Sequence, residues 1–173
     1  LQVGGITGTG EIIDNETPPT VISVEPGAPG IDGDAVIEGT PLVYTVTLSG
    51  PSTAPQTYPF SLGGGSATEG DDYTNTPVFS NGVIDHGDGT ISVPAGVENF
   101  TVTVPTIDDT EHEPGANETV PLQVGGVTGT GQIIDNETPP TVVSVEPGAP
   151  GISDDAVIEG NDLVYTVTLS GPS

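Results

Sequence analysis

The chain of 173 residues contains no lysine and no arginine, against 25 aspartates and glutamates. Charged residues make up 14% of the chain, well below the usual quarter, so the net charge of −25 reflects missing cations rather than unusual acidity. Nucleic acids and anionic membrane surfaces both attract positive charge, which excludes them as partners. The carboxylates must therefore be balanced by cations from solvent or by a bound metal.

Cysteine and tryptophan are absent as well, and only four tyrosines and three phenylalanines are present. No disulfide can form, and a sugar-binding platform of stacked aromatic rings is not expected. No apolar run approaches the roughly 18 residues that a membrane helix needs, so membrane insertion is not expected either. The two histidines, His86 and His112, are far apart, which disfavours a zinc site.

What the chain does have is a long internal repeat. Residues 1–52 return as residues 122–173, an offset of 121 positions, with seven differences. A period of this length matches a whole domain rather than one unit of a solenoid. We therefore expect a tandem array in which residues 1–17 end one repeat, residues 18–138 form a complete repeat, and residues 139–173 begin the next. The Pro-Pro pair at each junction favours a stiff, extended link.

Apolar residues alternate with polar ones between turns rich in glycine, proline and asparagine, which predicts short β-strands. Pro121 within one of these strands suggests an edge position or a bulge. In residues 1–17 we expect a single strand. Seven or eight strands in one repeat predict an all-β fold, an antiparallel β-sandwich resembling the immunoglobulin type. The expected strands of the complete repeat are residues 21–25, 42–48, 58–62, 77–84, 90–93, 100–104, 120–124 and 129–135.

Carboxylates gather at the ends of these strands instead of spreading evenly. One cluster follows the strand at 100–104, and another, Asp135-Asn136-Glu137, follows the last strand and repeats Asp14-Asn15-Glu16. Paired acids repel unless a cation lies between them, and Ca²⁺ takes about six to eight oxygen ligands from such loops. The alternative is that these loops are simply acidic and solvated.

Four groups of residues, in order and at fitting spacing, make residues 20–137 resemble a Calx-beta domain. Tandem copies of such domains are similar to the extender regions of giant bacterial surface adhesins of the RTX type. The resemblance implies a β-sandwich that binds Ca²⁺ at one end, near the junction with the next domain. The matching groups are residues 36–39 with 44–49, 67–73, 107–109 with 117–119, and 129–137.

The same resemblance implies a set of calcium ligands. Asn136 stands where calcium-binding relatives often have aspartate. The candidate ligands are Glu38, Asp72, Asp108, Asp109, Glu113, Glu118, Asp135 and Asn136.

Other motifs are weaker. Residues 85–90, Asp-His-Gly-Asp-Gly-Thr, partly resemble a calcium-binding loop. They lack its twelve-residue pattern and closing glutamate, so a hairpin turn is expected. No nucleophile has a base partner, and identical copies of a catalytic site in every repeat are not typical of arrays. An enzyme is therefore not expected.

Two functions remain. The first is a structural one, a Ca²⁺-rigidified stalk repeat of an extracellular cell-surface adhesin, whose partners are the neighbouring repeats. The second is assembly: a tail from one copy pairs with the head of another and builds a filament or surface layer by strand addition.

Overall fold

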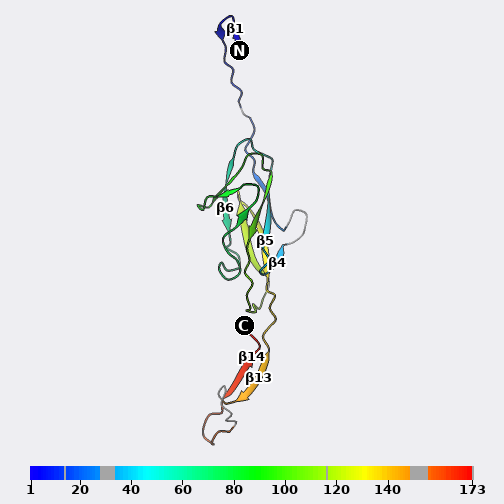
Figure 1. The fold of residues 1–173 in the computed structure, drawn as a ribbon, viewed down its shortest axis with the longest axis vertical. Helices are drawn as coiled ribbons and strands as arrows, with labels where there is room; N and C mark the ends of the chain where they lie inside the picture. The colour runs from blue at the N-terminus through cyan, green and yellow to red at the C-terminus, as the bar shows by residue number, and fades with distance from the viewer. Residues whose placement is uncertain (14, 28–33, 116, 149–155, 173) are drawn as a thin grey trace.

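The computed structural model describes residues 1–13, 15–27, 34–115, 117–148 and 156–172. Within these residues the regular structure is all β, and no helix is long and apolar enough to cross a membrane. Figure 1 shows a central sandwich with a small hairpin beyond each of its two ends.

Two sheets form the sandwich. One has the strand order β3-β5-β10-β7, and the other has the order β4-β12-β11-β6-β9-β8. The pairs are antiparallel apart from β4 and β12, which run parallel. The strands are β3 (Val21–Pro26), β4 (Ala35–Ile37), β5 (Leu42–Leu48), β6 (Gln56–Leu62), β7 (Val78–Phe79), β8 (Ile84–Asp85), β9 (Thr90–Val93), β10 (Asn99–Val104), β11 (Glu118–Val124) and β12 (Val127–Ile134).

Alternating side chains of both sheets fill one core. In β5, Leu42, Tyr44 and Val46 are fully buried, and the apolar residues of β11 face them from the other sheet. The Tyr44 hydroxyl donates to the carbonyl of Val120 and accepts from the amide of Gly131, which ties β5 to β11 and β12. Burial of these apolar side chains supplies most of the stability of the fold.

The expected β-sandwich is confirmed, and most of the expected strands appear. The single strand expected at residues 77–84 is wrong: β7 pairs with β10 in one sheet, and β8 pairs with β9 in the other. A turn at Asn81-Gly82, both with positive φ, separates them. The three-residue strand β4 was missed because its alternation is too short to recognise.

The expectation for Pro121 is also wrong, because β11 lies between β12 and β6 inside the sheet. Pairing with β6 stops at Leu122 and Leu62, one residue before the proline. The Pro121 carbonyl still accepts a hydrogen bond from the Gly63 amide (2.9 Å). The proline is tolerated because it lies where the neighbouring strand ends, so its missing N–H breaks no ladder hydrogen bond to β6.

The flanks repeat parts of the sandwich. Residues 1–17 contain a hairpin, β1 (Gln2–Val3) with β2 (Ile6–Thr7), rather than the single strand expected. Gly4 and Gly5, which form its turn, have positive φ angles, as do Gly125 and Gly126 in the turn between β11 and β12. At the other end, β13 (Val142–Pro147) pairs with β14 (Tyr165–Leu169) in the register of β3 with β5, including the same bulge.

Candidate metal centre

Strand ends bring the acidic residues together at one end of the sandwich. Because β4 and β12 run parallel and pair at Ile37 and Ile134, the residues that follow them leave the sheet side by side. The Glu38 amide continues this pairing by donating to the Ile134 carbonyl (3.1 Å). Glu38 is thereby placed next to the run Asp135-Asn136-Glu137.

The first acidic group consists of Glu38, Asp108 and Glu137. One carboxylate oxygen from each lies within 4.8 Å of the others, and the Glu38 side chain is only 9% exposed. The Asn136 side-chain amide donates to Glu38 Oε1 (3.1 Å) and to Asp108 Oδ1 (3.0 Å). A neutral amide therefore partly offsets the repulsion between these two carboxylates.

Gly39 permits the approach of Asp108 to this group. A Cβ atom at Gly39 would lie 2.8 Å from the Cβ of Asp108, closer than real side chains come. Gly39 also has a φ of +74°, which favours glycine. The chain therefore turns from β4 toward β5 without pushing Asp108 away.

The second acidic group consists of Asp72, Glu113 and Glu118, again with carboxylate oxygens within 4.8 Å of one another. Asp72 comes from the loop between β6 and β7, Glu113 from the segment before β11, and Glu118 from the start of β11. Asp72 is 6% exposed, and its Oδ2 accepts a hydrogen bond from the Thr68 amide. Asp72 thus converges with two glutamates from a much later part of the chain.

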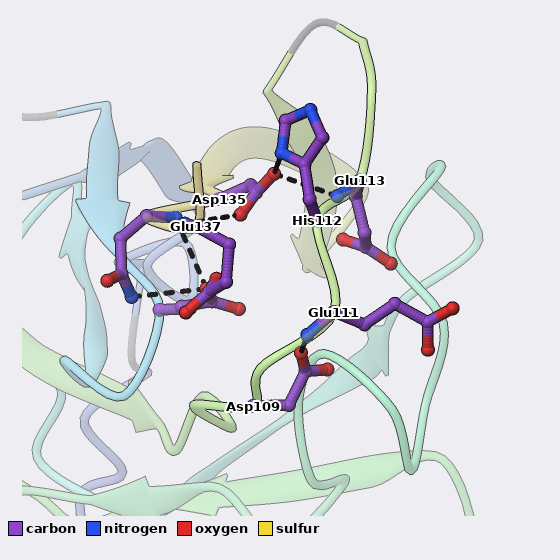
Figure 2. Close-up of polar contacts among 8 residues, drawn as sticks. Asp109, Glu111, His112, Glu113, Asp135 and Glu137 are labelled. Atoms are coloured by element: carbon purple, nitrogen blue, oxygen red, sulfur yellow. Dashed lines mark hydrogen bonds and ion pairs between the residues drawn. The ribbon is translucent and has the colours of Figure 1, made fainter. Parts of the chain in front are cut away.

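Asp135 connects the backbone segments of the two groups (Figure 2). Its Oδ1 accepts from the Glu137 amide (2.8 Å), and its Oδ2 accepts from the Glu113 amide (2.8 Å) and lies 2.8 Å from His112 Nδ1. Burial raises the pKa of Asp135, but the hydrogen bonds from Glu137 and Glu113 outweigh it, so the pKa is lowered. This carboxylate remains charged and holds both loops.

Three glutamates show the opposite behaviour. Burial, followed by the neighbouring Asp72, raises the pKa of Glu118 to about 7. The pKa of Glu137 is raised to about 7 by Glu38, then by burial and Asp135. The pKa of Glu113 is also raised, first by burial and then by Asp72 and Asp109. Each group therefore holds more negative charge than its surroundings stabilise.

Each group also contains a carboxylate oxygen without a donor. In the described part of the chain, Oε2 of Glu118 and Oε2 of Glu137 are buried and accept no hydrogen bond while ionised. A proton on either glutamate would let it bond to the neighbouring carboxylate, which adds to burial in raising the pKa of Glu118 and is the first cause of the raised pKa of Glu137. A cation among the oxygens would satisfy the same atoms, and carboxylate oxygens are the ligands that Ca²⁺ prefers.

The structure brings most of the predicted ligands together. Five of the eight lie in the two groups: Glu38, Asp72, Asp108, Glu113 and Glu118. Of the other three, Asp135 and Asn136 contact the groups as above, whereas Asp109 accepts a hydrogen bond from the Glu111 amide (2.7 Å), outside both groups. Metal binding by any of these residues stays a prediction.

Glu137 was missed by the sequence analysis. Its signal was its place in the acidic run that follows β12, but the run does not reveal which side chain turns inward. A pocket of about 440 Å³, lined by residues that include His112, Glu118, Asp135 and Glu137, opens beside the groups and gives ions access from solvent. Asp14, the equivalent of Asp135 in the preceding copy, lies outside the described residues.

The loop at residues 85–90 is the turn between β8 and β9, as expected. Asp85 Oδ1 accepts from the Gly87 amide (2.8 Å), and Asp88 Oδ1 accepts from the amide (3.0 Å) and hydroxyl (2.6 Å) of Thr90. Both carboxylates are thus used in turn formation. His86 Nε2 lies 2.8 Å from the Ser92 hydroxyl.

Comparisons with known proteins find distant structural likeness only. No family model matches the chain, and no curated protein matches it. A solved structure described as the crystal structure of the apo form of the Calx CBD1 domain aligns with 61% of this chain and 89% of its own, at 18% identity and a TM-score of 0.42. A likeness this distant assigns no role to any residue.

Proposed function

We propose that residues 18–138 form one calcium-binding repeat of a tandem array, and that the array is an extracellular stalk that projects a distal binding domain from a cell surface. The observation that carries this proposal is the pair of carboxylate groups at the end of the sandwich from which the chain continues into the next copy. No lysine or arginine is available to neutralise them.

Calcium would be held by the residues of the two groups. Glu38, Asp108 and Glu137 supply the oxygens of one site, and Asp72, Glu113 and Glu118 supply those of the other. At the first site a half-turn of the Asn136 amide would present its oxygen in place of its nitrogen. A bound ion would supply positive charge among these oxygens and would join the ends of β4 and β12 to the segments beside them.

A stiff connection between repeats supports the stalk role. The Tyr58 hydroxyl donates to the carbonyl of Pro19 (2.7 Å), which fixes the link to β6. Thr20 and Ser49 exchange two hydrogen bonds, from the Thr20 amide to Ser49 Oγ (3.0 Å) and from the Ser49 amide to the Thr20 carbonyl (2.8 Å). The next copy repeats both bonds between Thr141 and Ser170. Each link is therefore anchored to the repeat that follows it.

The resemblance of residues 20–137 to Calx-beta domains and to adhesin extender regions supports the same proposal. Repeats of one design joined by short proline links produce length and reach, whereas a catalytic role would not require them. The expected affinity for Ca²⁺ is that of extracellular modules, about 10⁻⁴ to 10⁻³ M.

Calorimetric titration with Ca²⁺ tests the metal sites. We expect two ions per chain, one for each group, and one ion after Asp72→Asn. The control is Asp85→Asn, an exposed aspartate outside both groups, which should leave the stoichiometry unchanged. Equal stoichiometry in both variants, or equal binding of Na⁺ and Ca²⁺ by the parent chain, contradicts the assignment.

Small-angle scattering of a chain with residues 18–138 twice in tandem tests the stalk. With Ca²⁺ we expect a narrow distribution of particle length near twice that of one repeat, and in EDTA a broader and shorter one. If the length distribution is the same with Ca²⁺ and in EDTA while the titration shows binding, calcium binds without stiffening the array.

A further inference from the structure

The hairpin β13–β14 exposes a face that is buried elsewhere in the same chain. It copies β3–β5 in sequence and register. Val24 and Tyr44 are 5% and 0% exposed in the sandwich, whereas the equivalent Val145 and Tyr165 are 58% and 56% exposed. The sandwich therefore shows which strand covers this face.

In the sandwich the covering strand is β12, and two glycines allow its close approach. A Cβ at Gly129 would overlap the carbonyl of Val24, and a Cβ at Gly131 would lie 2.7 Å from Leu42 Cδ2 and 2.8 Å from the Tyr44 hydroxyl. The backbone of β12 thus lies directly on β3 and on the side chains of β5. No other residue type fits these two positions without displacing the strands.

The same chain carries a second, uncovered copy of β12. Gly8 and Gly10 correspond to Gly129 and Gly131, and a Cβ at either would meet no atom within 4 Å. Ile12 is 98% exposed, whereas its counterpart Ile133 is 3% exposed. This segment and the β13–β14 face lie beyond opposite ends of the sandwich, so they do not meet within one molecule (Figure 1).

We propose that residues 1–13 of a second copy of this chain dock on the β13–β14 face wherever both surfaces are uncovered. Gly8 then lies on Val145, and Gly10 lies on Leu163 and Tyr165. Residues 11–13 run parallel beside residues 156–158, as β12 runs beside β4. The contact joins different surfaces of the two copies, so it propagates head to tail into a chain of molecules rather than closing as a dimer.

This association does not depend on calcium, and the net charge of −25 opposes it at low salt. The test is therefore sedimentation velocity of the 173-residue chain in EDTA, over a range of concentrations, in monovalent salt high enough to screen the charge. We expect the sedimentation coefficient to rise with concentration. A chain that stays monomeric up to its solubility limit overturns the proposal.

The Gly8→Val, Gly10→Val double variant separates specific docking from general apolar adhesion. Valine makes residues 1–13 more apolar, so adhesion would persist or increase, whereas docking against the Val145 backbone requires glycine and should be lost. Gly115→Val is the matched control, since it is exposed with open space around it and should associate as the parent does. Association of the double variant at the parental level overturns the proposal.

Two further measurements make the result unambiguous. The thermal midpoint of the double variant should equal that of the parent, because neither glycine contacts the sandwich. A synthetic peptide of residues 1–17 should dissociate the parental assemblies by competing for the β13–β14 face, and assemblies that resist it in excess count against the assigned surface.

Discussion

Glu118 experiences most directly the excess of negative charge in the second acidic group. It is partly buried beside Asp72, one of its oxygens has no donor, and its pKa is raised to about 7. Above that pH the folded state must keep an ionised carboxylate where a neutral one is favoured. In the absence of a metal this residue therefore destabilises the fold, and in the proposed site it would be a ligand.

Glu118→Gln should act in opposite directions with and without calcium. In EDTA at a pH of about 8, we expect the free energy of unfolding to rise by about 1 kcal/mol, allowing for partial solvent screening of the carboxylate. In Ca²⁺ the stabilisation by the metal should shrink. Denaturant unfolding in both buffers measures the two effects.

The control is Glu98→Gln, an exposed glutamate just before β10, at the end of that strand away from the acidic groups. It should change neither measurement. A Glu118→Gln variant that loses stability in EDTA would show that the carboxylate is stabilised by its surroundings and would contradict the charge argument.

The raised pKa values also determine a pH dependence. Glu118 and Glu137 bind protons in the folded state up to a pH of about 7, whereas unfolded glutamates release them near their ordinary pKa of 4.5. Since the folded state binds more protons between these limits, its stability without calcium should fall as the pH rises through them. Thermal unfolding in EDTA across this window checks the sign.

Calcium binding should show the reverse trend, because protons compete with the ion for the same oxygens. Below a pH of about 7 we expect the apparent affinity for Ca²⁺ to fall by about tenfold per pH unit for each proton displaced. An affinity that is constant between a pH of about 5 and about 8 would mean that neither glutamate is a ligand.

Among the elements, β12 is the strand that contributes both to the packing of the sandwich and to the acidic groups. It pairs with β11 and β4, its glycines lie on β3 and β5, and its end delivers Asp135, Asn136 and Glu137 to the acidic groups. The Tyr44 hydroxyl, bonded to Val120 and Gly131, locks β5 against both β11 and β12. Loss of this contact should therefore loosen the strand that carries the site.

Tyr44→Phe should lower the free energy of unfolding by about 1 to 3 kcal/mol, because it leaves buried backbone groups without their partner while keeping the ring. The chain offers its own control: Tyr165→Phe makes the same change at the equivalent position of the β13–β14 hairpin, where the ring is more than half exposed. That variant should unfold as the parent does. Equal losses in both variants would show that the buried hydrogen bonds contribute nothing specific.

The strands also show what local sequence can predict. The Gly-Gly turn forms a hairpin both at Gly4-Gly5 and at Gly125-Gly126, although only the second packs against a sandwich. Alternation likewise located β5, β9 and β10 within two residues. It failed at residues 77–84, because a run of mixed residues does not reveal that its two halves pair with strands of different sheets.

At the scale of the whole molecule, the missing cations matter most. The net charge is −25, and no lysine or arginine is present to pair with the carboxylates. Self-repulsion opposes the compact state and is screened over about 10 Å at 0.1 M salt. Stability should therefore depend on the ions in solution to an unusual degree.

Raising monovalent salt from about 0.01 M to about 0.15 M in EDTA should raise the thermal midpoint by about 5 °C or more. If calcium binds at the two groups as proposed, millimolar Ca²⁺ should raise the midpoint further than monovalent salt of equal ionic strength, which only screens the charges. Differential scanning calorimetry distinguishes the two contributions. A midpoint insensitive to monovalent salt would show that the charges are too well separated to repel.

The sequence by itself determined the repeat, the β-sandwich, most strands, and the gathering of acids at strand ends. These properties depend on alternation, turn residues and composition, which are local along the chain. Tertiary structure alone decided the grouping of the carboxylates, since Asp72 meets Glu113 and Glu118 only in the folded chain. It also decided burial: Val24 and Val145 have the same neighbours in sequence, and only the strand packed on Val24 makes it part of a core.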